Sequence, residues 1–367
     1  MSGLPTWGRR AAVVAGAAGV VVAGAAVGLA AERYAVGRSF RNASDPEADE
    51  QFGSLRGPVV PVTTSDGVAL HVEVEGPLPG ARKTPPATVV FCHGLALNQD
   101  SWHYQRRDLS DLAEDGIRLV FWDQRGHGRS ARGTAEHSTI EQLGRDLRSV
   151  ISATAPRGSL VLIGHSMGGM TIMALADQEP ELFRRRVIGV ALVSTSPGRL
   201  AEVSFGAPAA AVRLLRRAAP KALTALNRRP ALVSRGRSLG ADIEFVLTKR
   251  YSFATDVPPS LVQFVSRMHD AMPLDVLAEL FPAFDSHDKL AARDVLNGVE
   301  TLIVGGERDL MTPADHSRAM VEHVPGAELV ILPDAGHLLM LEHHDVLTDH
   351  LRDLVERALR HHSVTSA

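Results

Sequence analysis

Cysteine is almost absent from this sequence. The chain of 367 residues contains one cysteine, Cys92, so it cannot form an internal disulfide. Cys92 ends the apolar run 88–92, and such a run predicts a strand in which this small residue is buried, not a reactive thiol. Apolar residues make up 45% of the chain and charged residues 22%, which is ordinary for a globular protein.

A large excess of charge is also missing. The 39 basic and 42 acidic residues give a net charge of -3, which is no reason to expect a nucleic-acid partner. The sequence has no glycine-rich phosphate cradle and no metal-ligand spacing such as His-Glu-x-x-His, so we predict neither a cofactor nor a metal. Glu342, His343 and His344 could be mistaken for a metal cluster, but we interpret them as the solvated face of a helix.

Charged residues are absent from one long stretch near the N-terminus. Residues 11–31 consist of Ala, Val, Gly and a single Leu, and the stretch is long enough to span a bilayer as a helix. Arg9 and Arg10, in the basic region 1–10, precede it as in a signal or signal-anchor sequence. We expect an uncleaved single-pass membrane anchor. The alternative is a cleaved signal sequence and a secreted protein, because residues 28–30 (Gly-Leu-Ala) resemble a cleavage site.

The chain is longer than one ordinary hydrophobic core requires. Single cores stop growing at about 250–300 residues, so we expect one large domain with an accessory element. Residues 32–57 turn polar and acidic, and we predict that they form a linker between the anchor and this domain. We place the core of the domain in residues 58–198 and 297–361, with the accessory element inserted at residues 199–296.

Short apolar runs alternate with amphipathic stretches along the core. Continuous apolar strands separated by helices predict a mostly parallel, doubly wound sheet that is covered on both faces. Residues 59–74, with the turn Ser65-Asp66-Gly67, precede these runs and predict a hairpin at the edge of the sheet. The predicted parallel strands are residues 88–92, 119–122, 160–163, 187–193, 301–304 and 329–332.

Residues 199–296 contain no convincing strand and show several helical patterns, so we predict a helical cap. Its first part is rich in arginine, with leucine and valine interleaved. The plainer interpretation is a solvated helical face. The alternative is a basic amphipathic surface that rests on an anionic membrane near the anchor, which would suit a lipid-like substrate.

The sequence Gly-His-Ser-Met-Gly-Gly at residues 164–169 predicts a nucleophile elbow. It follows the apolar run 159–163 and leads into a helix-prone stretch, so Ser166 lies at a tight turn between a strand and a helix. Gly164 and Gly168 provide the small residues that such a turn requires on either side. The turn exposes the Ser166 hydroxyl above the edge of the sheet.

A serine hydroxyl needs a base, and the base needs an acid to orient it. Asp309 lies in the loop after the strand 301–304, and His337 lies in the loop after the last strand. Because these loops share the carboxyl edge of the sheet with Ser166, we expect the three residues to converge. The order Ser, Asp, His also fits this arrangement. Glu307 is a weaker candidate for the acid, and Asp334 is too close in sequence to His337.

These motifs resemble those of the α/β-hydrolase superfamily, which includes esterases, lipases, C–C bond hydrolases and cofactor-free haloperoxidases. The similarity extends from about residue 58 to about residue 360 and is interrupted by the cap. The pair His93-Gly94 resembles the oxyanion turn of the family. The resemblance implies that the backbone N–H groups of Leu95 and Met167 form the oxyanion hole.

The stretch 123–130 resembles a structural loop of the same family. The resemblance implies that Asp123 and Arg125 hold loops together and do not react. His165 neighbours the nucleophile, and we expect its side chain to point away from the site and to pack.

We therefore predict a membrane-anchored serine hydrolase that cleaves a small or lipid-like carboxylic ester through an acyl-enzyme intermediate. A Ser-triad C–C bond hydrolase or a cofactor-free haloperoxidase is the alternative, and a ligand-binding homologue without catalysis is a further one. A serine nucleophile argues against dehalogenases and epoxide hydrolases, which use a carboxylate. Tyr251 is the one tyrosine in the cap that could activate an epoxide.

Overall fold

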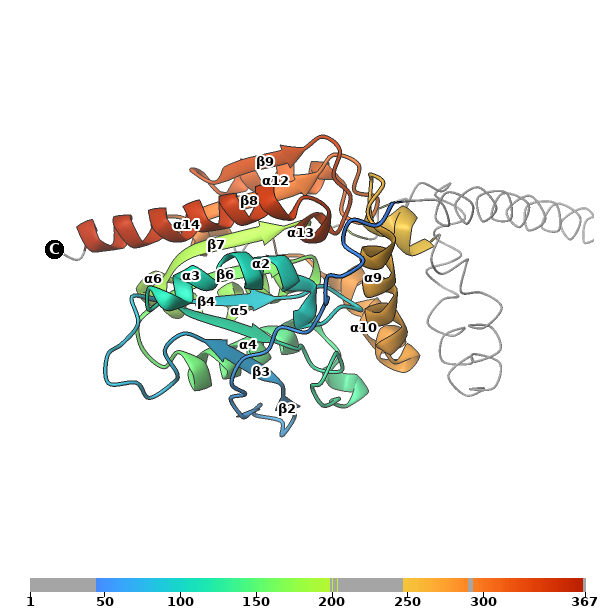
Figure 1. Ribbon diagram of the computed structural model, residues 1–367. Coiled ribbons are helices and arrows are strands. Elements are labelled where there is room, and N and C mark those ends of the chain that lie inside the picture. Colours follow the sequence, from blue (N-terminus) through green and yellow to red (C-terminus); the bar gives the residue numbers. More distant parts are fainter. Residues whose placement is uncertain (1–43, 199, 201–202, 204–246, 290–292, 366–367) are drawn as a thin grey trace, which may run out of the picture.

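A seven-stranded sheet forms the centre of the molecule (Figure 1). The computed structural model describes residues 44–198, 200, 203, 247–289 and 293–365. The strand order is β3-β5-β4-β6-β7-β8-β9; β3 is antiparallel to β5, and the other neighbours are parallel. The strands are β3 (Val72–Glu75), β4 (Ala87–Cys92), β5 (Arg118–Trp122), β6 (Ser159–His165), β7 (Val187–Val193), β8 (Glu300–Gly306) and β9 (Glu328–Leu332). The predicted mostly parallel sheet is confirmed.

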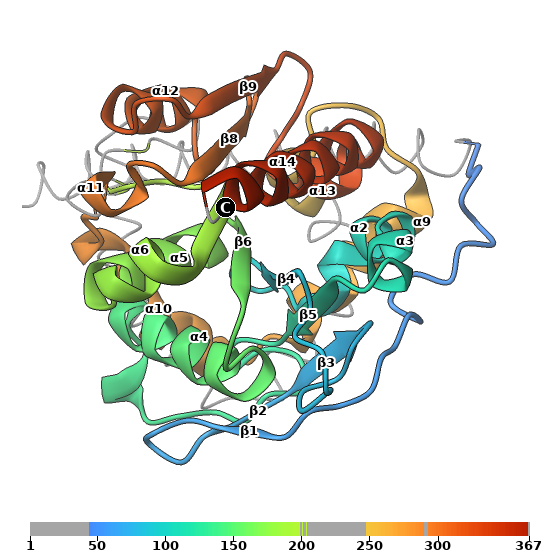
Figure 2. The same ribbon diagram turned by 90° about the vertical axis from the view of Figure 1, so that its left-hand side faces the viewer.

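Helices connect these strands and cover both faces of the sheet. The α-helices within the predicted core are α2 (His103–Asp108), α3 (Ser110–Glu114), α4 (Ile140–Thr154), α5 (Met167–Gln178), α6 (Pro180–Arg186), α12 (Ala314–His323), α13 (Leu339–Glu342) and α14 (His344–Thr365), and the short helix α11 (Arg293–Leu296) precedes β8. Two 3-10 helices, η1 (Gln99–Trp102) and η2 (Ala135–His137), lie in the connections. The view along the sheet separates α4, α5 and α6 on one side from α2, α3 and α14 on the other (Figure 2).

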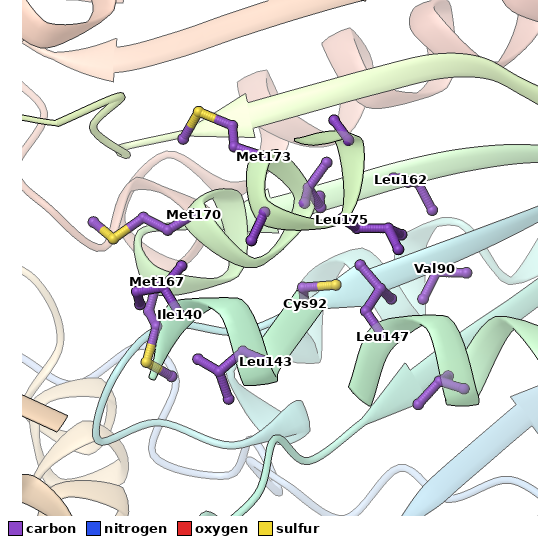
Figure 3. Packing of buried hydrophobic residues seen from close by; sticks show 14 of the residues in the cluster. Val90, Cys92, Ile140, Leu143, Leu147, Leu162, Met167, Met170, Met173 and Leu175 are labelled. Carbon is purple, nitrogen blue, oxygen red and sulfur yellow. The ribbon is translucent and has the colours of Figure 1, made fainter. Parts of the chain in front are cut away.

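Each face of the sheet has its own hydrophobic cluster. One cluster joins α4 and α5 to the sheet and includes Cys92, Leu147 and Met170 (Figure 3). The other lies under α2, α13 and α14 and includes Phe91 and Leu351. Neighbouring residues of β4 thus point to opposite clusters, as the alternation of side chains in a strand requires. The strands are buried on both faces, which explains their continuous apolar runs.

The predicted hairpin lies at the edge of the sheet. Its first arm, β1 (Val62–Thr63), pairs with β2 (Ala69–Leu70), and β3 follows directly and joins the main sheet beside β5. Gly67 has a φ of 85°, in the region that favours glycine, and its N–H donates to Thr64 O at 3.0 Å. The turn chemistry of the sequence therefore located the one antiparallel edge correctly.

Two further helices lie beyond the carboxyl ends of the strands (Figure 1). They are α9 (Pro259–Ala271) and α10 (Leu274–Ser286). The first contributes residues to the cluster under α2 and α14, and the second contributes residues to the cluster with α4 and α5. These helices and α11 lie in the described portion of the predicted cap, residues 199–296. Its arginine-rich part lies outside the described residues, so the division into core and cap remains a prediction.

The segment 44–57 is packed against the domain, which corrects the prediction of a linker for this part of residues 32–57. Phe52 stacks on Phe264 of α9 with ring centroids 5.1 Å apart and meets Tyr104 edge to face at 5.8 Å. Asp45 accepts hydrogen bonds at 2.9 Å from both the N–H and the hydroxyl of Ser260, at the first turn of α9. The acidic composition of this segment gave no sign that Phe52 packs against aromatic rings or that Asp45 accepts hydrogen bonds from the first turn of a helix.

Residues 11–31 lie outside the part of the chain that the structure describes. Within the described ranges, none of the helices combines the length and the apolar character needed to cross a bilayer. The predicted anchor is therefore still a prediction.

Candidate active site

Ser166 lies at a strained turn between β6 and α5. Its φ is 51° and its ψ is -117°, a conformation that L-residues rarely adopt and that recurs at functional sites. The Ser166 N–H donates to Val193 O at 2.9 Å, and the Thr195 hydroxyl donates to the Ser166 carbonyl oxygen at 2.6 Å. These bonds to the neighbouring strand β7 and the loop that follows it hold the turn, and they leave the Ser166 side chain half-buried at the sheet edge.

Gly164 and Gly168, on either side of Ser166, allow close contacts between the backbone of the turn, the start of α5 and the end of β4. A Cβ on Gly164 would lie 2.6 Å from the carbonyl carbon of Gly168, and a Cβ on Gly168 would lie 2.6 Å from the carbonyl carbon of Cys92. Side chains cannot be accommodated at such distances, because the atoms that they would meet belong to the backbone. The predicted elbow is therefore present, and its glycines are required by contacts as well as by the turn itself.

Asp309 and His337 come together although the sequence separates them by 28 residues. The His337 Nδ1 lies 2.8 Å from Asp309 Oδ2, which is a hydrogen bond in the neutral tautomer that carries the proton on Nδ1. Asp309 also accepts from the N–H groups of Met311 and Thr312 at 2.7 and 2.9 Å, and from the Thr312 hydroxyl at 2.8 Å. This loop fixes the carboxylate, and the carboxylate fixes the orientation of the ring.

Glu307, the weaker candidate for the acid, points elsewhere. Its carboxylate forms an ion pair with Arg318 at 2.6 Å, and its side chain is 47% exposed. Asp334 is still more exposed, and its nearest cation is Arg308 at 3.8 Å. Neither carboxylate hydrogen-bonds to His337, so of these candidates only Asp309 is placed to orient it.

His165 contacts the loop that carries His337. Its Nε2 donates to the backbone oxygen of His337 at 3.0 Å, and the two rings lie 4.8 Å apart. Burial lowers the pKa of His165 well below its usual range, with a smaller contribution from His337, so the ring is neutral. The expectation that His165 packs is correct, but its ring also supports His337, and the prediction that it points away from the site is wrong.

Two backbone N–H groups beside Ser166 have no partner. Leu95 follows the turn His93-Gly94, and Met167 is the first residue of α5, where an N–H has no acceptor within the helix. In the described ranges, neither N–H donates a hydrogen bond. The turn lies directly against the nucleophile, because a Cβ on Gly94 would be 3.3 Å from Ser166 Cβ. Their role as the oxyanion hole, which the resemblance implied, remains a prediction.

A cavity of about 410 Å³ opens above Ser166. Its lining includes Ser166, His337 and Leu95, together with one residue of α9 and four residues of α10. The Ser166 hydroxyl and the His337 ring thus share one space, although within the described residues no hydrogen bond joins them. The lining is mostly apolar. Such a cavity, with a few polar groups converging in it, is typical of a small-molecule site.

The sheet topology explains why this edge carries the site. The chain runs from β4 to β5 and then crosses back to β6 on the other side of β4. A parallel sheet opens a crevice at such a switch point, outside the carboxyl ends of the strands. Leu95 follows β4 and Ser166 follows β6, so the two lie on either side of that switch point.

A family model described as "Alpha/beta hydrolase family" matches residues 89–350, which is more than half of the chain. The chain belongs to the alpha/beta hydrolase family. The resemblance drawn from the sequence motifs is therefore confirmed.

Several relatives of this alpha/beta hydrolase carry an activity in their names. The sn-1-specific diacylglycerol lipase ABHD11 of Mus musculus is 28% identical over 258 residues, which cover 69% of this chain and 76% of the relative. A 2-hydroxy-6-oxononadienedioate/2-hydroxy-6-oxononatrienedioate hydrolase of Escherichia coli is 26% identical over 275 residues, 74% of this chain and 87% of the relative. A thermophilic esterase from Thermogutta terrifontis has the same fold, with a TM-score of 0.62 and 23% identity over 82% of this chain and 99% of the esterase.

Glu342 holds the loop of His337 in place, a role that the sequence analysis did not predict. Its carboxylate accepts hydrogen bonds from the N–H groups of Gly336, Ala254 and Thr255 at 2.6, 2.8 and 2.6 Å. It therefore joins the loop of His337 to the segment that leads into α9. The interpretation of Glu342 as part of a solvated helix face is wrong. No local sequence pattern predicts this role, because the partners of Glu342 are backbone N–H groups that only the fold brings near it.

Other predictions for this region agree with the structure. Asp123 accepts from the N–H groups of Gln99 and Arg129 at 2.7 and 2.8 Å, and Arg125 forms ion pairs with Asp66 and Asp146, so this loop is structural. Burial raises the pKa of the Cys92 thiol to about 12, which makes it unreactive.

The contact at Gly168 generates a stability test. Gly168→Ala should lower the free energy of unfolding by about 3 kcal/mol, because the new methyl group would press on the backbone of Cys92. Gly67→Ala is the matched control: it has a φ of 85° but nothing within 4 Å of an added Cβ, so about 1 kcal/mol should be lost. Urea unfolding measures both. Equal losses would contradict the tight contact.

Proposed function

We propose that this alpha/beta hydrolase cleaves carboxylic esters through an acyl-enzyme intermediate. The observation that carries the proposal is the shared cavity. It holds the Ser166 hydroxyl and the His337 ring, with Asp309 behind that ring and two free N–H groups beside the serine. A nucleophile, a base, an orienting acid and an oxyanion site are the parts that acyl transfer needs.

Each group has one role in the reaction. His337 takes the proton of Ser166 while the serine oxygen bonds to the carbonyl carbon of the ester. The N–H groups of Leu95 and Met167 stabilise the negative charge that develops on the carbonyl oxygen. His337 then gives the proton to the leaving alcohol as the C–O bond breaks. Water, deprotonated by His337, releases the acid from Ser166 in the second half of the cycle.

The relatives support an ester as the substrate. The names of the mouse lipase and of the Thermogutta esterase both denote ester hydrolysis. The apolar lining of the cavity suits an apolar acyl group. Small and lipid-like esters therefore fit the site.

A C–C bond hydrolase is the second candidate, because the name of the Escherichia coli relative gives as its substrate a keto-dicarboxylate, which contains no ester bond to hydrolyse. The name of its substrate denotes a dicarboxylate, which a site would bind with cationic side chains. The described residues that line the cavity include no Lys or Arg. For this reason we rank ester hydrolysis first.

We also propose that residues 11–31 anchor the enzyme in a membrane. The proposal is supported by the uncharged apolar composition of this stretch. Asp45 bonds to the first turn of α9, so residue 44 lies on the cap side of the molecule. Residues 32–43 span at most about 40 Å when extended, which would keep the cap side near the membrane surface.

Removing the nucleophile tests the mechanism. Ser166→Ala should lower kcat on a short-chain aryl ester by about five powers of ten and abolish labelling by a fluorophosphonate probe. Ser110→Ala, an exposed serine of α3, is the control and should leave both unchanged. Labelling that persists in Ser166→Ala would refute the assignment of the nucleophile.

Substitutions of Asp309 and Glu307, two positions apart, test which carboxylate orients His337. Asp309→Asn should lower kcat by three to four powers of ten (about 10⁴-fold at most), because the amide favours the wrong tautomer of His337. Glu307→Gln changes an exposed ion pair and should alter kcat by less than about twofold. The comparison uses the same ester for both variants. Similar losses in the two would show that Asp309 has no special role.

Cell fractionation tests the anchor. The full chain should remain in the membrane pellet after an alkaline carbonate wash. Val21→Arg, at the middle of residues 11–31, should move much of it to the soluble fraction, because a central Arg costs about 2.5–3.5 kcal/mol of insertion. Val21→Leu is the matched control and should stay in the pellet. A shortened chain in the soluble or secreted fraction of wild-type cells would instead favour a cleaved signal sequence.

A further inference from the structure

The cavity has two chemically different walls. The wall on α10 is apolar and presents Leu274, Leu277, Phe281 and Phe284. The wall on α9 and on the segment before it is polar and consists of Tyr251, Ser252 and His269. A cavity divided in this way suits a substrate with one apolar and one polar end.

The two walls belong to opposite faces of the sheet. Residues of α10 such as Val276 and Leu280 pack into the cluster with α4 and α5. Residues of α9 such as Val265 and Met268 pack into the other cluster, together with Leu338. Because Ser166 follows a central strand, the walls flank it on either side.

The polar wall is the one next to His337. The N–H of Leu338, the residue after the base, donates to the backbone oxygen of Ser252 at 2.9 Å. His269 is close enough to His337 for the charge of one ring to affect the other. Since His337 must deliver a proton to the leaving oxygen, the alcohol part of an ester has to lie on this side. The acyl part then lies along α10.

His269 is a neutral ring with an unused nitrogen. Burial lowers its pKa to about 4, and the neighbouring His337 adds to this effect while Asp270 opposes it, so the ring is uncharged at neutral pH. Its Nδ1 lies 3.4 Å from the Thr248 hydroxyl. In the part of the chain that the structure describes, its Nε2 has no hydrogen-bond partner. Because His269 lines the cavity, this nitrogen can hydrogen-bond to a ligand hydroxyl.

We propose that Tyr251, Ser252 and His269 form a subsite for a hydroxyl-bearing alcohol, and that His269 selects esters of such alcohols over esters of simple alkanols. The inference rests on the proposed ester hydrolysis and extends it to the leaving group. The reaction itself is unchanged: the C–O bond breaks, the acyl group passes to Ser166, and the alcohol leaves with the proton from His337. His269 takes no proton in this scheme and acts by hydrogen bonding alone.

Two esters with one acyl chain test the subsite. Glyceryl monohexanoate and propyl hexanoate differ only in the two hydroxyl groups of the alcohol. For the full wild-type chain, kcat/KM should favour the glyceryl ester, and the ratio of the two values should fall about tenfold in His269→Leu. His269→Gln, whose amide can still hydrogen-bond, should restore most of the ratio. His323→Leu, outside the cavity lining, is the control and should keep the wild-type ratio.

The possible failures can be told apart. If His269→Leu slows both esters by the same factor, His269 serves only the structure of the wall, and the subsite is refuted while ester hydrolysis stands. A wild-type preference for the propyl ester refutes the subsite in the same way. If the wild type cleaves neither ester and does not react with the fluorophosphonate probe, the proposed function fails and the subsite fails with it.

Discussion

Contact between backbones at the carboxyl end of β6 constrains everything around Ser166. Gly164 and Gly168 let the turn, the start of α5 and the end of β4 approach one another to distances that no Cβ would tolerate. The Leu95 N–H belongs to the turn that follows β4, and the Met167 N–H belongs to the first residue of α5, directly after the serine. Its strained φ is therefore held by the surrounding sheet and not by local preference. The fold itself thus builds the turn that carries the Ser166 side chain, as a preorganised site requires.

The partners of Ser166 depend on the sheet in a second way. Asp309 and His337 lie in the loops that follow the neighbouring strands β8 and β9. The backbone N–H of Met311 donates to the Asp309 carboxylate, and the His165 ring donates to the backbone oxygen of His337. Glu342 extends this support to the segment before α9. The base loop and one wall of the cavity are thus joined by hydrogen bonds, so the position of His337 and the shape of the polar wall are linked.

Some features could be predicted because their causes are short-range. The elbow needs its glycines within two positions of Ser166, the edge hairpin needs its Asp-Gly turn, and each buried strand shows as one apolar run. Other features could not be predicted, because they depend on residues that are far away in the sequence. Phe52 lies in an acidic stretch, yet Phe264 and Tyr104 cover its ring. The sequence analysis did not single out His269, because no local pattern shows the cavity beside α9.

The sequence by itself determined the family and the parallel sheet and predicted Ser166, Asp309 and His337 as catalytic residues, because motif order and strand periodicity can be followed along the chain. The tertiary structure decided which carboxylate reaches His337, what His165 and Glu342 do, and how the walls of the cavity differ. These outcomes depend on distances between residues far apart in sequence. Such distances follow from how two helical layers pack on one sheet, and no local pattern encodes them.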